Sequence, residues 1–132
     1  NPIFTGLIKK LGAFPVKRGS NDTKAIDSAL ESLNHGRIFV IFPEGTRSKT
    51  GDLGKPKSGV SLIAARAKVP VVPVFVKYGR KKIRQNVLMS IGEPIPAEDF
   101  DVDYTDKYAI RKVSEEIMGK ISELKENAPD VR

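Results

Sequence analysis

The chain has 132 residues, of which 39% are hydrophobic and 30% are charged, as expected of one globular domain rather than of two domains or a disordered chain. It contains no Cys and a single His, which excludes disulfides and thiolate zinc sites and argues against a histidine-rich metal site. The net charge of +7 is uneven, because residues 1–97 hold 17 Lys/Arg against 6 Asp/Glu (net +11) and residues 98–132 carry a net charge of −4.

The excess of positive charge in residues 1–97 favours an anionic partner: a phospholipid headgroup, a nucleotide, an acidic carrier protein or a nucleic acid. The sequence has neither an apolar run of transmembrane length nor a visible signal peptide. Contact with a membrane surface stays open. The first residue is Asn1 and an amphipathic pattern is already in progress at Ile3, so we expect the chain to be part of a longer one, truncated at its N-terminus.

The first third of the sequence predicts two helices, each followed by a short strand. Apolar residues recur at helical spacing in residues 3–11 and again in residues 22–34, which Gly36 ends. Residues 13–16 predict a short strand. Residues 37–42 form a β-branched and aromatic run that predicts a buried strand, which Pro43 terminates because it has no amide to donate.

The remainder continues this alternation after a polar loop. A helix is expected over residues 58–67, a strand buried on both faces over residues 69–76, and a further strand over residues 87–91. An acidic linker then leads to a last helix over about residues 105–125. Helices that alternate with short apolar strands predict one α/β domain over residues 1–132, with a mixed, largely parallel sheet flanked by helices.

The segment that follows the strand at residues 37–42 holds the strongest candidates for function. Glu44, Gly45, Thr46 and Arg47 place a carboxylate, a permissive glycine, a hydroxyl and a guanidinium in one turn. A guanidinium presents a planar fork that suits phosphate oxygens, and a carboxylate can hold that fork or accept substrate hydroxyls. The alternative is a salt-bridged turn without further function. Placement after a buried strand favours the functional interpretation.

Two further groups of cations lie near predicted helix starts. Lys17 and Arg18 precede the helix at residues 22–34, so Arg18 and Arg47 would clasp one phosphate if their strands are neighbours; the alternative is a solvated basic turn. Lys57-Ser58-Gly59 resembles a phosphate cradle, although a plain helix cap explains it equally well and the loop lacks a Walker A pattern.

The basic run of residues 78–84 and the single histidine carry weaker signals. A basic turn is usually solvated, but it also suits an anionic lipid surface, and nucleic-acid binding is the least favoured option because no nucleic-acid-binding motif accompanies it. His35 lies at the predicted end of a helix and has no carboxylate four or five residues later. The sequence therefore favours a helix-capping role for His35 over a catalytic one.

Four blocks resemble, in order and spacing, the glycerolipid acyltransferase family, which includes lysophosphatidic acid acyltransferases. Phe42–Ser48 (Phe-Pro-Glu-Gly-Thr-Arg-Ser) is similar to the family's central block, and Gly12–Arg18 to a block that ends in a phosphate-contacting arginine. Lys57–Gly59 matches a lysine-x-glycine, and Val69–Val74 a hydrophobic strand near the active site. The resemblance covers residues 1–97 and implies a glycerol-3-phosphate acyltransferase-like fold.

The family's catalytic element, a histidine followed four residues later by an aspartate, has no counterpart in this sequence. In the family that histidine is the general base on the acceptor hydroxyl and the aspartate orients it. We therefore expect no catalytic residue in this chain, a His-x4-Asp upstream of it, and no activity of the chain alone. The resemblance implies substrate binding by Arg18, Glu44, Gly45, Thr46, Arg47 and Lys57, with Glu44 orienting either the glycerol or its binding loop.

The implied activity is transfer of a fatty acyl group from acyl-CoA or acyl-carrier protein to lysophosphatidic acid in phospholipid biosynthesis. We expect no metal and no other cofactor, a peripheral location on the cytoplasmic face of a membrane, and no nucleic-acid partner. The alternative function is a non-enzymatic module that binds anionic lipid or phosphate through the same basic loops.

Overall fold

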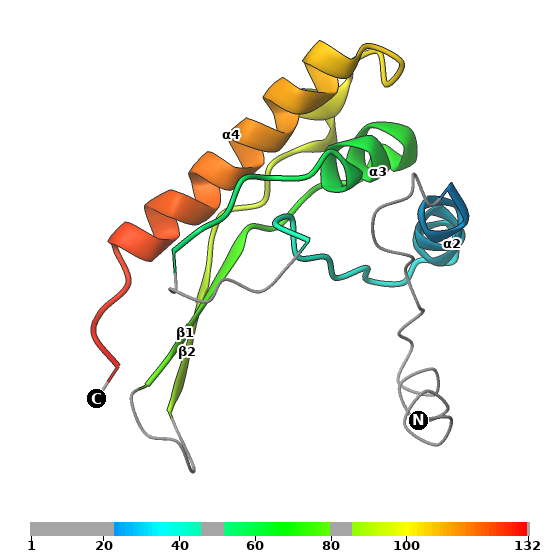
Figure 1. Cartoon of the computed structure of the whole chain (residues 1–132). Helices are drawn as coiled ribbons and strands as arrows, with labels where there is room; N and C mark the ends of the chain where they lie inside the picture. Colours follow the sequence, from blue (N-terminus) through cyan, green and yellow to red (C-terminus); the bar gives the residue numbers. More distant parts are fainter. Residues whose placement is uncertain (1–22, 46–51, 80–85, 132) are drawn as a thin grey trace, which may run out of the picture. The chain divides into compact units, whose positions relative to one another are not determined.

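A computed structural model describes residues 23–45, 52–79 and 86–131 (Figure 1). The chain forms two compact units, residues 1–39 and residues 40–132. The described part of the first unit, residues 23–39, contains helix α2, Thr23–Asn34. Its apolar residues Ile26, Ala29, Leu30 and Leu33 follow helical spacing, and Ala29 is fully buried.

The second unit contains helix α3 (Gly59–Ala67), strands β1 (Val74–Tyr78) and β2 (Val87–Ile91), the short 3-10 helix η1 (Ala97–Phe100) and helix α4 (Lys107–Glu126). α4 packs against α3 and against both strands (Figure 1). The core of this unit consists of buried apolar side chains from α3, η1 and α4: Val60, Ala64, Phe100, Val113, Ile117, Met118 and Ile121. Burial of this apolar stripe stabilises α4 far more than its helix propensity does.

Strands β1 and β2 pair antiparallel, with Val74 opposite Ile91 and Tyr78 opposite Val87. Side chains alternate between the two faces of such a pair. Phe75 packs against the core, whereas Tyr78 and Ile91, on the other face, are 61% and 65% exposed. The expectation that the strand over residues 69–76 is buried on both faces is therefore wrong. The strand also begins later than expected, at Val74. Pro70 and Pro73 lack amide donors, so the regular ladder begins only at Val74.

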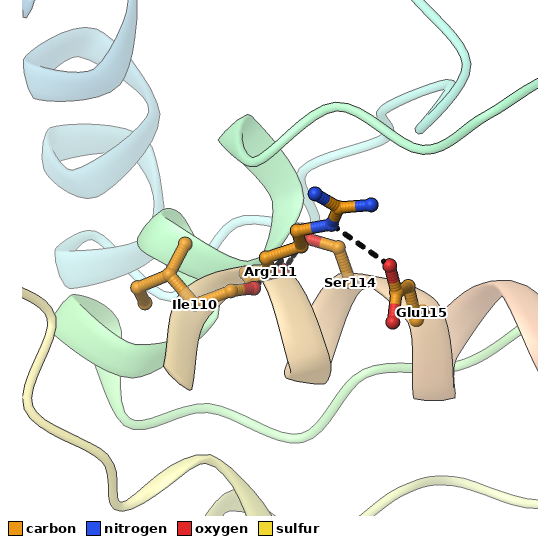
Figure 2. Close-up of polar contacts among 5 residues, drawn as sticks. Ile110, Arg111, Ser114 and Glu115 are labelled. Atoms are coloured by element: carbon orange, nitrogen blue, oxygen red, sulfur yellow. Dashed lines mark hydrogen bonds and ion pairs between the residues drawn. The ribbon is translucent and has the colours of Figure 1, made fainter. Parts of the chain in front are cut away.

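Helix α4 is closed at its start by Asp106, whose Oδ1 accepts a hydrogen bond from the Tyr108 amide at 2.8 Å. On its exposed face Arg111 pairs with Glu115 at 2.9 Å, one turn away, and on its buried face the Ser114 hydroxyl donates to the Ile110 carbonyl at 3.0 Å (Figure 2). The helices expected over residues 22–34, 58–67 and 105–125 and the strand over 87–91 are thus confirmed within one or two residues at each end.

Residues 37–42 differ from expectation. They form no strand, and Ile38 and Phe42 are 90% and 74% exposed. A strand is defined by ladder hydrogen bonds to a neighbour, and in the described part of the chain the sheet consists of β1 and β2. The α/β class is confirmed; the parallel character of the sheet stays a prediction, since the described pair is antiparallel. The helix and strand expected over residues 3–16 lie outside the described residues.

Candidate functional site

The candidate site begins with a tight turn at Pro43 and Glu44. The Gly45 amide donates to the Phe42 carbonyl at 3.0 Å, which closes the turn. Gly45 has φ of +71°, in the left-handed region that a side chain makes costly and a glycine tolerates. The turn therefore requires Gly45 for its backbone geometry.

A backbone hydrogen bond joins this turn to the segment that leads into α3. The Lys57 amide donates to the Pro43 carbonyl at 2.7 Å. The Lys57 side chain then lies over Gly45, because a Cβ added to Gly45 would stand 3.2 Å from Lys57 Cγ. The structure thus brings together Glu44, Gly45 and Lys57, three of the residues predicted from the sequence.

Glu44 makes a contact that the sequence did not suggest. Its Oε2 accepts a hydrogen bond from the Gly54 amide at 2.6 Å, a short, charge-assisted contact between residues ten positions apart. A Cβ on Gly54 would lie 3.2 Å from Oε2 and 3.6 Å from Glu44 Cβ and Cγ. The absence of a side chain at Gly54 therefore permits the close approach.

The cationic side chain of Lys57, just before α3, lies beside the backbone of Gly45, which has no side chain. Lys57 is exposed and Gly45 is exposed, while Glu44 is half-buried. An exposed lysine whose Cγ and Cε lie against a glycine turn can offer its ammonium to an anionic oxygen. Arg18, Thr46 and Arg47, the other predicted substrate-binding residues, lie outside the described residues, so their roles stay predictions.

The sequence predicts residues 52–54 only as part of a polar loop and does not predict their contacts with the core, α4 and Glu44. Leu53 packs against the buried core and the Asp52 carboxylate pairs with Lys125 of α4 at 3.5 Å. A leucine within a polar loop was the one available signal of an anchored segment. The contact of Gly54 with Glu44 had no signal at all in the sequence.

His35 has the surroundings of a helix end. Its Nδ1 lies 2.7 Å from the Glu31 carbonyl oxygen, which can only accept, so Nδ1 is the donor. Gly36 follows with φ of +69° and donates to the Leu33 carbonyl. These contacts confirm the helix-capping interpretation of His35.

No group of three or more His, Cys, Asp or Glu side chains in residues 23–45, 52–79 and 86–131 lies close enough to hold a metal ion. In the same ranges, none of the helices combines the length and the apolar character needed to cross a membrane.

Comparisons with known proteins give concordant results. The model of the Acyltransferase family matches residues 1–77. The chain is 31% identical over 128 residues to 1-acyl-sn-glycerol-3-phosphate acyltransferase of Bacillus subtilis (strain 168) and 34% identical over 113 residues to the chloroplastic LPAT1 of Arabidopsis thaliana, which has the same activity in its name. These alignments cover 94% and 76% of this chain.

The structure is similar to the crystal structure of the 1-acyl-sn-glycerophosphate (LPA) acyltransferase PlsC from Thermotoga maritima. The TM-score is 0.58 at 31% sequence identity, over 78% of this chain and 44% of that chain. The present chain spans 63% of the Bacillus relative and 32% of the Arabidopsis relative. It therefore corresponds to a portion of each of these three proteins.

Proposed function

Because this chain belongs to the acyltransferase family, we propose that it forms the acceptor-binding portion of a 1-acylglycerol-3-phosphate O-acyltransferase. The reaction transfers a fatty acyl group from the thioester of acyl-CoA or acyl-carrier protein to the free hydroxyl of lysophosphatidic acid. The hydroxyl oxygen attacks the thioester carbonyl and loses its proton to a base, and the thiol leaves. Phosphatidic acid is the product.

The observation that carries the proposal is the position of the Lys57 side chain over Gly45, with Cγ 3.2 Å from the place of a Cβ on that glycine. Arg47 follows two residues after Gly45 in the sequence. A guanidinium and an ammonium from residues this close to one turn in the sequence would suit the phosphate of lysophosphatidic acid, which accepts several charge-assisted hydrogen bonds. Arg18 is the proposed third cation, Thr46 and Gly45 shape the turn, and Glu44 orients the glycerol or the loop that binds it.

The catalytic base is not proposed among the residues of this chain, since the sequence contains no His-x4-Asp. A histidine and an aspartate from outside residues 1–132 would take the proton from the acceptor hydroxyl. In this proposal the cations of the chain hold the acceptor phosphate. Binding thereby places the acceptor hydroxyl close to the base, which accelerates the reaction.

A peripheral position at the cytoplasmic face of a membrane is also proposed. The net charge of +11 in residues 1–97 supports it, because anionic lipid attracts each nearby cation by about 1 kcal/mol. Co-sedimentation should be stronger with phosphatidylglycerol vesicles than with phosphatidylcholine vesicles, and the difference should disappear at high salt. Equal binding to both would contradict a role for charge.

The proposed activity is tested with labelled acyl-CoA and acyl-carrier protein as donors and lysophosphatidic acid, lysophosphatidylcholine or no acceptor. Two proteins are compared: residues 1–132 and the complete product of the gene that encodes them. We expect the complete product to form phosphatidic acid and residues 1–132 to form none. Turnover by residues 1–132 would mean that the base is misassigned.

The non-enzymatic alternative is favoured by one observation, the missing catalytic pair. It predicts that the complete gene product binds phosphate or anionic lipid but transfers no acyl group to any acceptor. A His-x4-Asp in the complete product, together with turnover, would exclude this alternative.

A further inference from the structure

Three consecutive residues, 52–54, connect the Pro43–Gly45 turn of the site to the core and to α4. The Gly54 amide donates to Glu44 Oε2 at 2.6 Å, on the Pro43–Gly45 turn. Leu53 packs against the core that α3 and α4 share. Asp52 accepts a hydrogen bond from Lys125, in the last turn of α4, at 3.5 Å. We call residues 52–54 the anchor segment.

The three contacts differ in strength. Leu53 removes apolar surface from water and is the principal attachment of the segment to the core. The pair of Asp52 and Lys125 is long and its carboxylate side chain is 78% exposed, so it adds little. The hydrogen bond to Glu44 is short and charge-assisted. It is therefore the contact that fixes the turn to the anchored segment.

The anchor segment also holds the two ends of the connection between Glu44 and Gly54 close to each other. Residues 45–53 connect Glu44 to Gly54, and the hydrogen bond between those two residues holds the ends of the connection together. The Lys57 amide adds a second closure at the Pro43 carbonyl. These two hydrogen bonds hold the Pro43–Gly45 turn in place before a ligand binds, so less conformational entropy is lost on binding.

We infer that Glu44 and Gly54 are positioning residues: the Glu44 carboxylate holds the Gly54 amide, and through it the anchor segment fixes the Pro43–Gly45 turn beneath Lys57. Glu44 thus acts on the acceptor through the Pro43–Gly45 turn rather than by binding the glycerol. The inference rests on the proposed function for its consequence in acceptor binding, but the anchoring itself is independent of that function.

The inference also gives α4 a part in the site. The family model matches residues 1–77, so α4 (Lys107–Glu126) lies outside the matched residues. It nevertheless supplies core residues beneath Leu53 and the partner of Asp52. Changes in the buried face of α4 should therefore loosen the site as well as the fold.

The experiment compares four variants with the parent chain in the complete gene product: Glu44→Ala, Glu44→Gln, Gly54→Ala and the double variant Glu44→Ala/Gly54→Ala. Gly119→Ala is the matched control, because a Cβ on Gly119 meets nothing within 4 Å. Amide hydrogen exchange at position 54 reports the anchoring. The affinity for glycerol 3-phosphate, measured by titration calorimetry, reports its consequence, and circular dichroism verifies folding.

A glutamine carbonyl can still accept from the Gly54 amide, whereas alanine cannot, and a Cβ on residue 54 would stand 3.2 Å from Oε2 and push the carboxylate away by a few tenths of an ångström. Glu44→Ala and Gly54→Ala should each accelerate exchange at position 54 and weaken glycerol 3-phosphate binding by about tenfold, the value of one charge-assisted hydrogen bond. The double variant should be no worse than either single one. Glu44→Gln should rescue most of both losses, and Gly119→Ala should change neither.

Two outcomes would overturn the inference. In one, Glu44→Gln loses affinity as fully as Glu44→Ala although position 54 stays protected, which means that the charge contacts the ligand directly. In the other, Glu44→Ala leaves exchange at position 54 unchanged, which means that no anchoring exists. If the parent protein fails to bind glycerol 3-phosphate, the proposed function fails, and the exchange measurement still decides the anchoring. The two glutamate variants add no bulk, so they remain decisive even if Gly54→Ala does not fold.

Discussion

The hydroxyls of Ser61 and Ser114, from α3 and α4, are hydrogen-bonded to each other inside the core. Ser61 is fully buried and Ser114 is 2% exposed. The Ser114 hydroxyl donates its proton to the Ile110 carbonyl at 3.0 Å (Figure 2). Ser61 must therefore donate to Ser114, and the two residues form one polar link between α3 and α4.

Loss of Ser114 should cost more than loss of Ser61. Ser114→Ala leaves the Ser61 hydroxyl buried without its acceptor, which costs about 1–3 kcal/mol of unfolding free energy, whereas Ser61→Ala should cost about 1 kcal/mol. Urea denaturation of both variants and of the double variant checks this order. If the double variant loses the sum of the two single losses in unfolding free energy, the two serines share no hydrogen bond. Ser32→Ala on α2 is the control.

The buried face of α4 should dominate its contribution to stability. Ile117 is 1% exposed, so Ile117→Ala should lower the unfolding free energy by about 2–5 kcal/mol. Arg111→Ala breaks the exposed pair with Glu115 on the same helix and should cost about 0.5 kcal/mol or less. Similar losses from both variants, measured by chemical denaturation, would mean that α4 is not held by its apolar face.

Asp103 offers a test of local electrostatics. The hydroxyl of Thr105 donates to the Asp103 carboxylate at 2.6 Å, and the Thr105 amide donates to it at 2.8 Å. These hydrogen bonds, the one from the hydroxyl most of all, hold the pKa of Asp103 below its ordinary value. A lowered pKa in the folded state stabilises the fold above the ordinary pKa, and this contribution is lost as the pH falls through the folded value.

Thr105→Val removes the hydroxyl and should raise the Asp103 pKa toward its ordinary value. Carboxyl-carbon NMR titration of the parent and the variant measures the difference directly. Identical Asp103 pKa values in the two proteins would show that the Thr105 hydroxyl does not act on this carboxylate in solution.

Lys57 and Lys55 form a matched pair for the proposed clamp. Both are exposed lysines in one short segment, but only Lys57 is among the proposed binding residues. Lys57→Met keeps the amide that bonds Pro43 and removes the ammonium, so binding of glycerol 3-phosphate should weaken by about tenfold with stability unchanged. Lys55→Met removes the same charge and should have a much smaller effect. Equal losses would indicate a diffuse electrostatic effect.

The described helices and β2 were predictable because their signals are local. The apolar residues of α4 recur at helical spacing, and the same residues form the core. Residues 37–42 have an equally clear apolar signal but form no strand, because a strand depends on a neighbour that composition does not reveal. Prolines 70 and 73 delayed the start of β1 for a local reason that the sequence could have shown.

The candidate site was predictable in part for the same reason. Gly45 was predictable because a glycine shortly after a proline indicates a turn, and Gly45 indeed has φ of +71°. The hydrogen bond of Glu44 to Gly54 depends on the path of the intervening chain. No local pattern encodes that path, so the anchor segment emerged only from the structure.

The most direct test of the proposed clamp is Arg47→Ala in the complete gene product, with KM measured separately for lysophosphatidic acid and for the acyl donor. Loss of a bidentate guanidinium contact should raise the acceptor KM by about tenfold to a hundredfold. The donor KM should change by less than about threefold, well below the value of one such contact. Equal increases in both KM values would contradict the assignment of this turn to the acceptor phosphate.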